Sequence, residues 1–375
     1  MKIVCDNKIP FLKGALEPYA EVAYLPGKDT TAEVVRDADA IITRTRTICN
    51  EALLKGSKVK VIATATIGFD HIDTAWCEAN GIVWANAPGC NSWSVKQYIA
   101  SVLVTLAKKH SLRLADLTLG VVGVGNVGSK VAEVATLLGM KVLLNDPPRA
   151  RKEGDAMFVT LDEITEQSDI ITVHVPLSTT GDDATWHLFD ARRLAKLTPR
   201  QILINSSRGP VVDNNALKQA LERRQLKGAV LDVWEGEPDL DAGLVSLLDI
   251  ATPHIAGYSA DGKANGTTMS VRTVAKCLGL PLAEWKASDV PAPRQPLTFA
   301  IDGKGKSKQD IVSEAILYTY DVTADSEALR ASTDTFEAQR GDYPVRREPT
   351  AYTVALTNVE EETAETLRKI GFQTK

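Results

Sequence analysis

Three residues in separate segments of the chain could together take a proton from an alcohol. His254 lies in the run Thr252-Pro-His-Ile-Ala-Gly257, Glu237 lies 17 positions before it, and Arg208 lies in Asn205-Ser-Ser-Arg-Gly209. An imidazole titrates near neutral pH and can act as a general base, and a carboxylate can orient it. A guanidinium can grip an anion through two parallel hydrogen bonds. The set therefore suits oxidation of a hydroxyl group that stands beside a carboxylate.

Each of these residues also has an ordinary structural interpretation. Arg208 could be a surface residue in a turn, Glu237 could be a solvated loop glutamate, and a histidine after Thr-Pro is often structural. The occurrence of all three downstream of a nucleotide-binding signature favours the catalytic interpretation. The other histidines lack companions of this kind; they are His71, His110, His174 and His187.

A glycine-rich segment upstream has the pattern of a dinucleotide-binding turn. Gly123-Val-Gly-Asn-Val-Gly128 follows a strand-like run and opens a helical one, which is the context that this motif requires. The helix N-terminus would offer free N–H groups to a pyrophosphate. Asp146 lies 18 residues past Gly128, where a carboxylate accepts hydrogen bonds from ribose hydroxyls and disfavours the 2′-phosphate of NADP. The residues predicted to contact NAD on these grounds are Gly123, Gly125, Asn126, Val127, Gly128 and Asp146.

Two further segments would complete the cofactor site at the carboxyl ends of strands. The backbone around Ser206, Ser207 and Arg208 follows an apolar run and could line the nicotinamide. Asp232 ends the next strand-like run and could bond the nicotinamide carboxamide or the ribose. The alternative for Asp232 is a helix cap or a turn carboxylate whose hydrogen bonds are already satisfied.

The elements that position these residues form two α/β series and a third unit. Residues 1–115 alternate short β-branched runs with helical ones, which suits a parallel sheet covered by helices, and 94–109 is a long helical pattern. A second series begins at Leu117, and residues 258–280 look like a helix that returns to the first domain. The last unit contains helical patterns at 306–317 and 360–369 and a strand pattern at 352–356. The strand patterns of the first two series are 2–5, 40–42, 59–63, 82–84, 119–122, 141–144, 170–173, 201–204 and 228–231.

We therefore predict an α/β protein of three domains. A Rossmann-type NAD-binding domain at 96–257 is inserted in a flavodoxin-like substrate-binding domain formed by 1–95 and 258–283. A proline-rich linker leads to a small α+β domain at 284–375. That domain has amphipathic helices and no chemical motif, so we predict that it mediates a homodimer.

Composition narrows the class of protein. The chain has 375 residues, 44% hydrophobic and 24% charged, as in globular proteins, and a net charge of −5 argues against nucleic-acid binding. Five scattered cysteines without metal-ligand spacing predict reduced thiols, a cytoplasmic location and no metal site. No apolar run is long enough for a membrane helix, so no membrane partner is expected.

These motifs resemble the D-2-hydroxyacid dehydrogenase family over about residues 60–270. The resemblance implies that Arg208 holds the C1 carboxylate, and that His254, paired with Glu237, takes the C2 hydroxyl proton as hydride leaves C2 for NAD. It further implies cofactor contacts near Val175, Ser206 and Gly257, through the main chain at Val175 and Ser206. The motifs that carry it are 123–128, 205–213, 231–238 and 252–257.

Within that family the resemblance is closest to the branch that oxidises 4-phospho-D-erythronate on the way to pyridoxal phosphate. It implies a phosphorylated hydroxy acid as substrate and a C-terminal module of this length. Thr45, Thr66 and Tyr258 are the substrate ligands that we predict, and Arg44 and Arg46 could equally be solvated. Arg346-Arg347 could serve the pocket of a neighbouring subunit, but a solvated basic pair is the expectation. The supporting segments are 43–46, 87–91, 145–149 and 254–263.

Three alternatives compete with this interpretation. The nearest is another dehydrogenase of the family, such as one that acts on 3-phosphoglycerate, which a regulatory amino-acid-binding module in 285–375 would favour. A scaffold that senses NADH without turnover would have no need of Arg208, Glu237 and His254. Cys90 as the nucleophile of an aldehyde dehydrogenase lacks a neighbouring base. One departure from the family is Lys96-Gln97, where relatives commonly have a glutamate that could make a domain-bridging ion pair.

Overall fold

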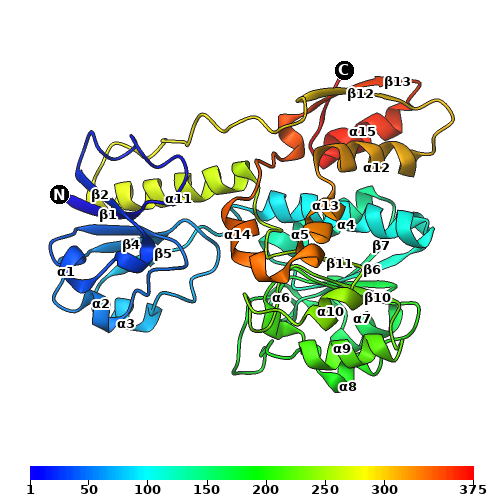
Figure 1. Cartoon of the computed structure of the whole chain (residues 1–375), viewed down its shortest axis with the longest axis horizontal. Helices are drawn as coiled ribbons and strands as arrows, with labels where there is room; N and C mark the ends of the chain where they lie inside the picture. The colour runs from blue at the N-terminus through cyan, green and yellow to red at the C-terminus, as the bar shows by residue number, and fades with distance from the viewer. The chain divides into compact units, whose positions relative to one another are not determined.

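The chain forms two compact units. The computed structural model describes all of residues 1–375 (Figure 1). The first unit comprises residues 1–91 and 258–292, and the second comprises 92–257 and 293–375. The first unit is therefore discontinuous, and we refer to residues 293–375 of the second as the C-terminal module.

The first unit is built on a parallel sheet with the strand order β2-β1-β3-β4-β5, which is the flavodoxin-like order. Buried aliphatic side chains lie on both faces of the sheet, and each face is covered by helices. The strands are β1 (Lys2–Asp6), β2 (Glu21–Leu25), β3 (Ala40–Thr43), β4 (Val61–Thr64) and β5 (Val83–Ala85). The short helices α1 (Ala32–Val35), α2 (Glu51–Leu54) and α3 (Thr74–Ala79) cover one face.

The returning helix covers the other face of this sheet. Helix α11 (Ala260–Leu278) begins at Ser259, whose side chain accepts the Gly262 N–H, and ends at Gly279 in the left-handed conformation. Its residues Val271 and Val274 pack in one core with Ile3 and Ile42. The prediction of a helix at 258–280 is confirmed, and this helix groups with residues 1–91 in the first unit. Strand β2 is an element that the pattern did not reveal.

The second unit contains a six-stranded parallel sheet, with the order β11-β10-β9-β8-β6-β7. Counted from its own first strand this order is 2-1-3-4-5-6, so the order reverses between β6 and β8, and the carboxyl ends of these strands are where such sheets bind ligands. The strands are β6 (Thr118–Val122), β7 (Lys141–Asn145), β8 (Ile170–Val173), β9 (Ile202–Asn205), β10 (Gly228–Leu231) and β11 (Ile250–Ala251). The helices are α4 (Ser92–His110), α5 (Asn126–Leu137), α6 (Pro147–Glu153), α7 (Leu161–Gln167), α8 (Ala191–Leu194), α9 (Asn214–Glu222) and α10 (Ala242–Leu247).

The C-terminal module adds a three-stranded sheet in which all strands are parallel. Stacked and edge-on rings of Phe299, Tyr318 and Tyr352 pack between this sheet and its helices. The strand expected at 352–356 and the charged helices expected at 306–317 and 360–369 are confirmed, within one residue for the strand and two for the helices. The elements are β12 (Thr298–Asp302), α12 (Lys308–Thr319), α13 (Val322–Ala331), α14 (Phe336–Gly341), β13 (Thr353–Thr357), α15 (Glu361–Ile370) and β14 (Gln373–Thr374).

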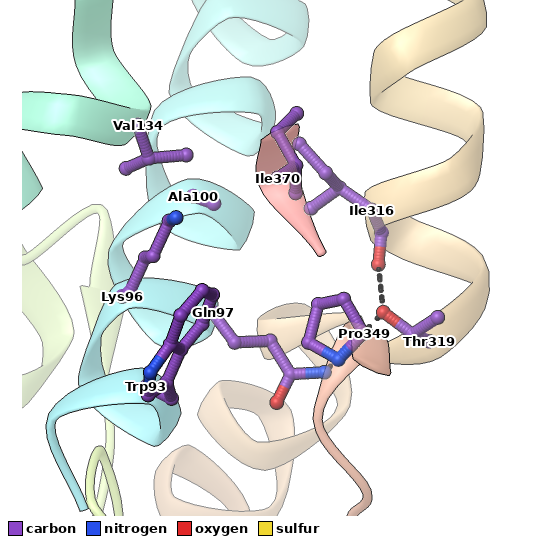
Figure 2. A pocket seen from close by; sticks show the side chains of 9 residues that line it. All are labelled: Trp93, Lys96, Gln97, Ala100, Val134, Ile316, Thr319, Pro349 and Ile370. Carbon is purple, nitrogen blue, oxygen red and sulfur yellow. Dashed lines mark hydrogen bonds between the residues drawn. The ribbon is translucent and has the colours of Figure 1, made fainter. Parts of the chain in front are cut away.

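The module is held to α4 by hydrogen bonds that are largely removed from solvent. Ser94 donates to the Glu348 carboxylate at 3.0 Å, and Gln97 donates to the Arg347 carbonyl at 2.9 Å. Figure 2 shows the side chains of α4, α12 and the Pro349 turn around the small pocket where these elements meet. Since the module groups with 92–257 in one unit, a separate third domain stays a prediction.

Lys96 lies on the same helix and is almost fully buried. Its Nζ is 3.3 Å from the Glu133 carboxylate on α5 and lies over the Trp93 ring. Burial lowers the pKa of Lys96, and the charge of Glu133 opposes this shift. The lysine at this departure from the family thus pairs within the second unit.

Candidate active site

Glu237 and His254 meet at the carboxyl edge of the second sheet. Glu237 lies in the loop after β10, His254 follows β11, and Glu237 Oε1 is 2.6 Å from His254 Nδ1. The side chains are 28% and 31% exposed, so a ligand can reach a pair that is otherwise packed. With Nδ1–H donating to the carboxylate, Nε2 carries the lone pair that a general base needs.

Glu237 is held in its ionised form. Burial raises the pKa of its carboxyl group, but the hydrogen bond and charge of His254, the charge of Arg340 and the Trp234 N–H together bring the pKa below its ordinary value. At neutral pH the carboxylate is therefore available to stabilise the imidazolium that forms when His254 accepts a proton.

The turn that carries His254 is held by Asp232. His254 has a φ of 56°, in the left-handed region that non-glycine residues adopt at a cost. Asp232, 1% exposed, accepts the Ile255 N–H at 2.8 Å through Oδ1 and the Ala256 N–H at 3.0 Å through Oδ2. Burial raises the pKa of Asp232, against the charge of His254 and these donors. Its predicted contact with nicotinamide stays a prediction beside this observed structural role.

The sequence patterns did not identify the side chains that hold this turn through hydrogen bonds to Asp232 and Thr252. The Thr252 hydroxyl donates to Asp232 at 2.7 Å and is 2.8 Å from the Tyr98 hydroxyl. Trp234 Nε1 donates to the Thr252 carbonyl at 3.0 Å. Thr252 and Trp234 stand inside the motifs, but nothing in the pattern around Tyr98 connects it to a residue 154 positions away.

Arg208 follows β9 in a turn built by its neighbours. The Asn205 side chain donates to the Arg208 carbonyl at 2.9 Å and accepts from the Ser207 N–H and hydroxyl. A side chain at Gly209 would overlap the Trp234 carbonyl, so only glycine lets the Arg208 turn lie against the loop that carries Glu237. The structure therefore brings the Arg208, Glu237 and His254 loops together in one unit.

The glycine-rich turn fits a dinucleotide. Gly123 has a φ of 86° and packs against the His174 carbonyl and Val175, which follow β8. A Cβ at Gly125 would meet nothing within 4 Å, so the packing of the chain itself does not require glycine there, whereas close approach by a pyrophosphate does. Helix α5 begins after Gly125 without a side-chain cap, which leaves its first N–H groups for phosphate oxygens.

Asp146 caps α6 as well as standing at the expected ribose position. Its Oδ1 accepts the Arg149 N–H at 3.1 Å and its Oδ2 accepts the Val124 N–H of the glycine-rich turn at 2.8 Å. Nearby, burial lowers the pKa of His174 to about 3, so this imidazole stays neutral. His174 thus lines this edge of the sheet without acting as a base near neutral pH.

The predicted substrate ligands all lie in the first unit. Thr45 and Thr66 each stand two residues after the ends of the adjacent parallel strands β3 and β4, and Tyr258 directly precedes the α11 cap. Thr66 donates to the Gly68 carbonyl at 2.9 Å, and Lys263 lies over the Tyr258 ring. Their roles stay predictions.

One group with metal-ligand chemistry was not visible in the sequence spacing. Single ligand atoms of His187, Asp213 and Glu235 lie within 4.8 Å of one another. His187 Nε2 is already hydrogen-bonded to Glu235 at 2.7 Å, and Glu235 accepts the Asn214 N–H at 2.8 Å. The group therefore joins the Glu237 loop to the start of α9 by hydrogen bonds.

Comparison with known proteins places this site in a family. Residues 93–256 match the D-isomer-specific 2-hydroxyacid dehydrogenase NAD-binding domain, and 293–371 match a domain family of unknown function. Erythronate-4-phosphate dehydrogenase of Bacteroides fragilis is 50% identical, over 95% of this chain and all of its own length. That of Porphyromonas gingivalis is 43% identical over 99% of this chain and all of its own. The chain belongs to the erythronate-4-phosphate dehydrogenases.

Membership of this family confirms several predictions. The D-2-hydroxyacid dehydrogenase resemblance, the Rossmann-type NAD-binding domain and the NAD-dependent oxidoreductase class all hold. Among solved structures, D-lactate dehydrogenase of Aquifex aeolicus with NAD and lactic acid aligns with a TM-score of 0.63 at 28% identity, covering 74% of this chain and 96% of that one. No helix is long and apolar enough to cross a membrane.

Proposed function

We propose that this chain oxidises 4-phospho-D-erythronate at C2 to (R)-3-hydroxy-2-oxo-4-phosphooxybutanoate, a step in the synthesis of pyridoxal 5′-phosphate. The observation that carries the proposal is the 2.6 Å contact between Glu237 and His254, in a chain with such close relatives. Bound NAD would supply the hydride acceptor at the carboxyl ends of β6 and β8. The glycine-rich turn, the α5 N-terminus and Asp146 would hold it.

Residues of the chain itself bind the C1 carboxylate of the substrate and accept its C2 hydroxyl proton. Arg208 binds the C1 carboxylate through its guanidinium and so fixes C2 relative to the base. His254 Nε2 accepts the C2 hydroxyl proton as C2 loses a hydride, and a carbonyl forms at C2. Glu237 holds the Nδ1–H and balances the positive charge that develops on the ring. The positions that we assign to the rest of the substrate and its phosphate are Thr45, Thr66 and Tyr258.

The first test is NADH formation with 4-phospho-D-erythronate and 3-phospho-D-glycerate side by side. A 2-oxo acid is added as acceptor and product is followed directly, so that tightly held NADH cannot mask turnover. We expect a higher kcat/KM for the four-carbon substrate. Preference for 3-phosphoglycerate would contradict the proposed substrate but keep the mechanism. NADH binding without turnover of either substrate would favour a scaffold that senses NADH.

The assigned role of Asp146 predicts a change in cofactor preference. Asp146→Ser keeps a side-chain oxygen that can cap α6 but removes the negative charge. We expect the ratio of kcat/KM for NAD to that for NADP to fall by about 10-fold or more, because repulsion of the 2′-phosphate is lost. The ratio is measured with both cofactors at saturating substrate. An unchanged ratio in a folded variant would contradict the assignment.

We also infer a homodimer formed through the C-terminal module and a cytoplasmic location. The amphipathic helices of the module support the first, and five cysteines without a disulfide support the second. Light scattering of the full chain should give about twice the 40.5 kDa of one copy. A mass of one copy at micromolar concentration would contradict the dimer.

A further inference from the structure

Arg346 of the C-terminal module is a buried cation beside the catalytic turn. Only 4% of the residue is exposed, so the expectation of a solvated Arg346-Arg347 pair is wrong for Arg346. Its Nη2 donates to the Ala256 carbonyl at 2.6 Å, two residues after His254. Burying a guanidinium costs free energy, and this guanidinium makes a single hydrogen bond, to a backbone carbonyl.

The surroundings of Arg346 hold the guanidinium in place. Its Cζ lies 4.4 Å from the centre of the Tyr320 ring and 5.8 Å from that of Tyr343. The hydroxyls of both tyrosines donate to Asp325, at 2.8 and 2.7 Å. Nε and Nη1 have no hydrogen-bond partner, so the ring faces and the carboxylate of Asp325 compensate the buried charge. This arrangement fixes the direction in which Nη2 points.

Arg346 and Asp232 hold Ala256 from opposite sides. The Ala256 N–H donates to Asp232 and the Ala256 carbonyl accepts from Arg346, so the two peptide groups that flank Ala256 are both fixed. The same segment holds His254 at a φ of 56°, which is less favourable for a non-glycine residue than the common backbone conformations. Asp232 belongs to the NAD-binding residues, whereas Arg346 belongs to the C-terminal module and lies 90 positions after Ala256.

We propose that Arg346 is a positioning residue for the general base. By holding the Ala256 carbonyl it keeps the turn in the conformation in which His254 Nδ1 meets Glu237. The C-terminal module is then part of the catalytic apparatus in every copy of the chain, whatever else it binds. The kinetic consequence rests on the proposed function, whereas the structural consequence does not.

The kinetic test compares two arginines of the module. Arg346→Met keeps an unbranched apolar stem but is shorter and removes the donor. Arg330→Met is the matched control, because Arg330 also donates to backbone carbonyls of the NAD-binding residues, those of Val245 and Leu248, without touching the His254 turn. We expect Arg346→Met to lower kcat by about 10-fold or more, as a displaced base does, with KM and the Kd of NADH within about three-fold of wild type. Arg330→Met should keep wild-type kcat.

Two outcomes would overturn the proposal. One is a kcat of folded Arg346→Met within two-fold of wild type, and the other is an equal loss in Arg330→Met, which would assign the effect to docking of the module as a whole. If Arg346→Met does not fold, Arg346→Gln takes its place, since it stays polar but is too short to reach Ala256. The same limits on kcat then apply.

A spectroscopic readout separates this proposal from the proposed function. The chain has only 5 histidines, so the Nδ1–H signal of His254 in histidine-labelled holoenzyme is assigned by its loss in His254→Gln. We expect this signal to shift or broaden in Arg346→Met and to stay unchanged in Arg330→Met. An unchanged signal in Arg346→Met would refute the positioning role. A changed signal in an enzyme that does not oxidise 4-phospho-D-erythronate would refute only the substrate.

Discussion

Replacing His254 by glutamine should lower kcat by about 10³-fold while NADH still binds with nearly wild-type affinity. Glutamine can keep a hydrogen bond to Glu237 but cannot accept the substrate proton, and general-base catalysis typically contributes 10² to 10⁴ in rate. The glycine-rich turn and α5 are untouched by this change, so the cofactor site remains. Steady-state kinetics and NADH fluorescence titration measure the two quantities.

The matched control for this variant is His110→Gln. His110 lies in the same unit and also contacts a carboxylate, Asp249 at 3.0 Å, but it belongs to none of the loops that hold the reacting groups. We expect its kcat to remain within about two-fold of wild type. A His254→Gln enzyme with a kcat near that of the control would remove His254 from the mechanism.

Replacing Arg208 by lysine should reduce kcat/KM by about 10²-fold even though the charge is kept. Lysine is a point charge and cannot make the two parallel hydrogen bonds by which a guanidinium aligns a carboxylate. Loss of alignment affects the transition state more than ground-state binding, so we expect kcat to fall together with kcat/KM. Kinetics with 4-phospho-D-erythronate at varied concentration give both values.

Arg192→Lys is the control for Arg208→Lys. Arg192 is an exposed residue of α8 and should tolerate the change without loss of activity. Added guanidinium ion should restore part of the activity of Arg208→Gly but none in His254→Gln. An Arg208→Lys enzyme with wild-type kcat/KM would mean that the carboxylate is held elsewhere.

The sequence revealed those parts of the fold that rest on local patterns. Buried parallel strands such as β8 and β10 are short β-branched or apolar runs, and the predicted bounds 170–173 and 228–231 agree with them. Strand β2 was missed because it lies at the sheet edge and is only partly buried, and β11 because it has two residues. Edge position and short length leave little periodicity to detect.

The chemistry of the site was easier to predict than its support. His254, Glu237 and Arg208 are recognisable because few residue types can perform their tasks. Asp232 was equally recognisable in the sequence. However, a carboxylate that contacts nicotinamide and one that holds a backbone turn cannot be told apart until the hydrogen-bond donors are known. Tyr98 and Arg346 reach the same turn over long stretches of chain through single side-chain contacts, and such contacts leave no mark on spacing or composition.

The discontinuity of the first unit in the sequence determines when this unit can finish folding during its synthesis on the ribosome. One apolar face of its sheet is covered partly by the segment 9–16 and partly by α11, which is synthesised after the whole of residues 92–257. The nascent first sheet therefore leaves part of the face that contains Ile3 and Ile42 exposed to water until α11 has left the exit tunnel. During that interval the early chain is a natural client for chaperones that bind exposed apolar surface, and slow translation of the middle segment would lengthen its exposure.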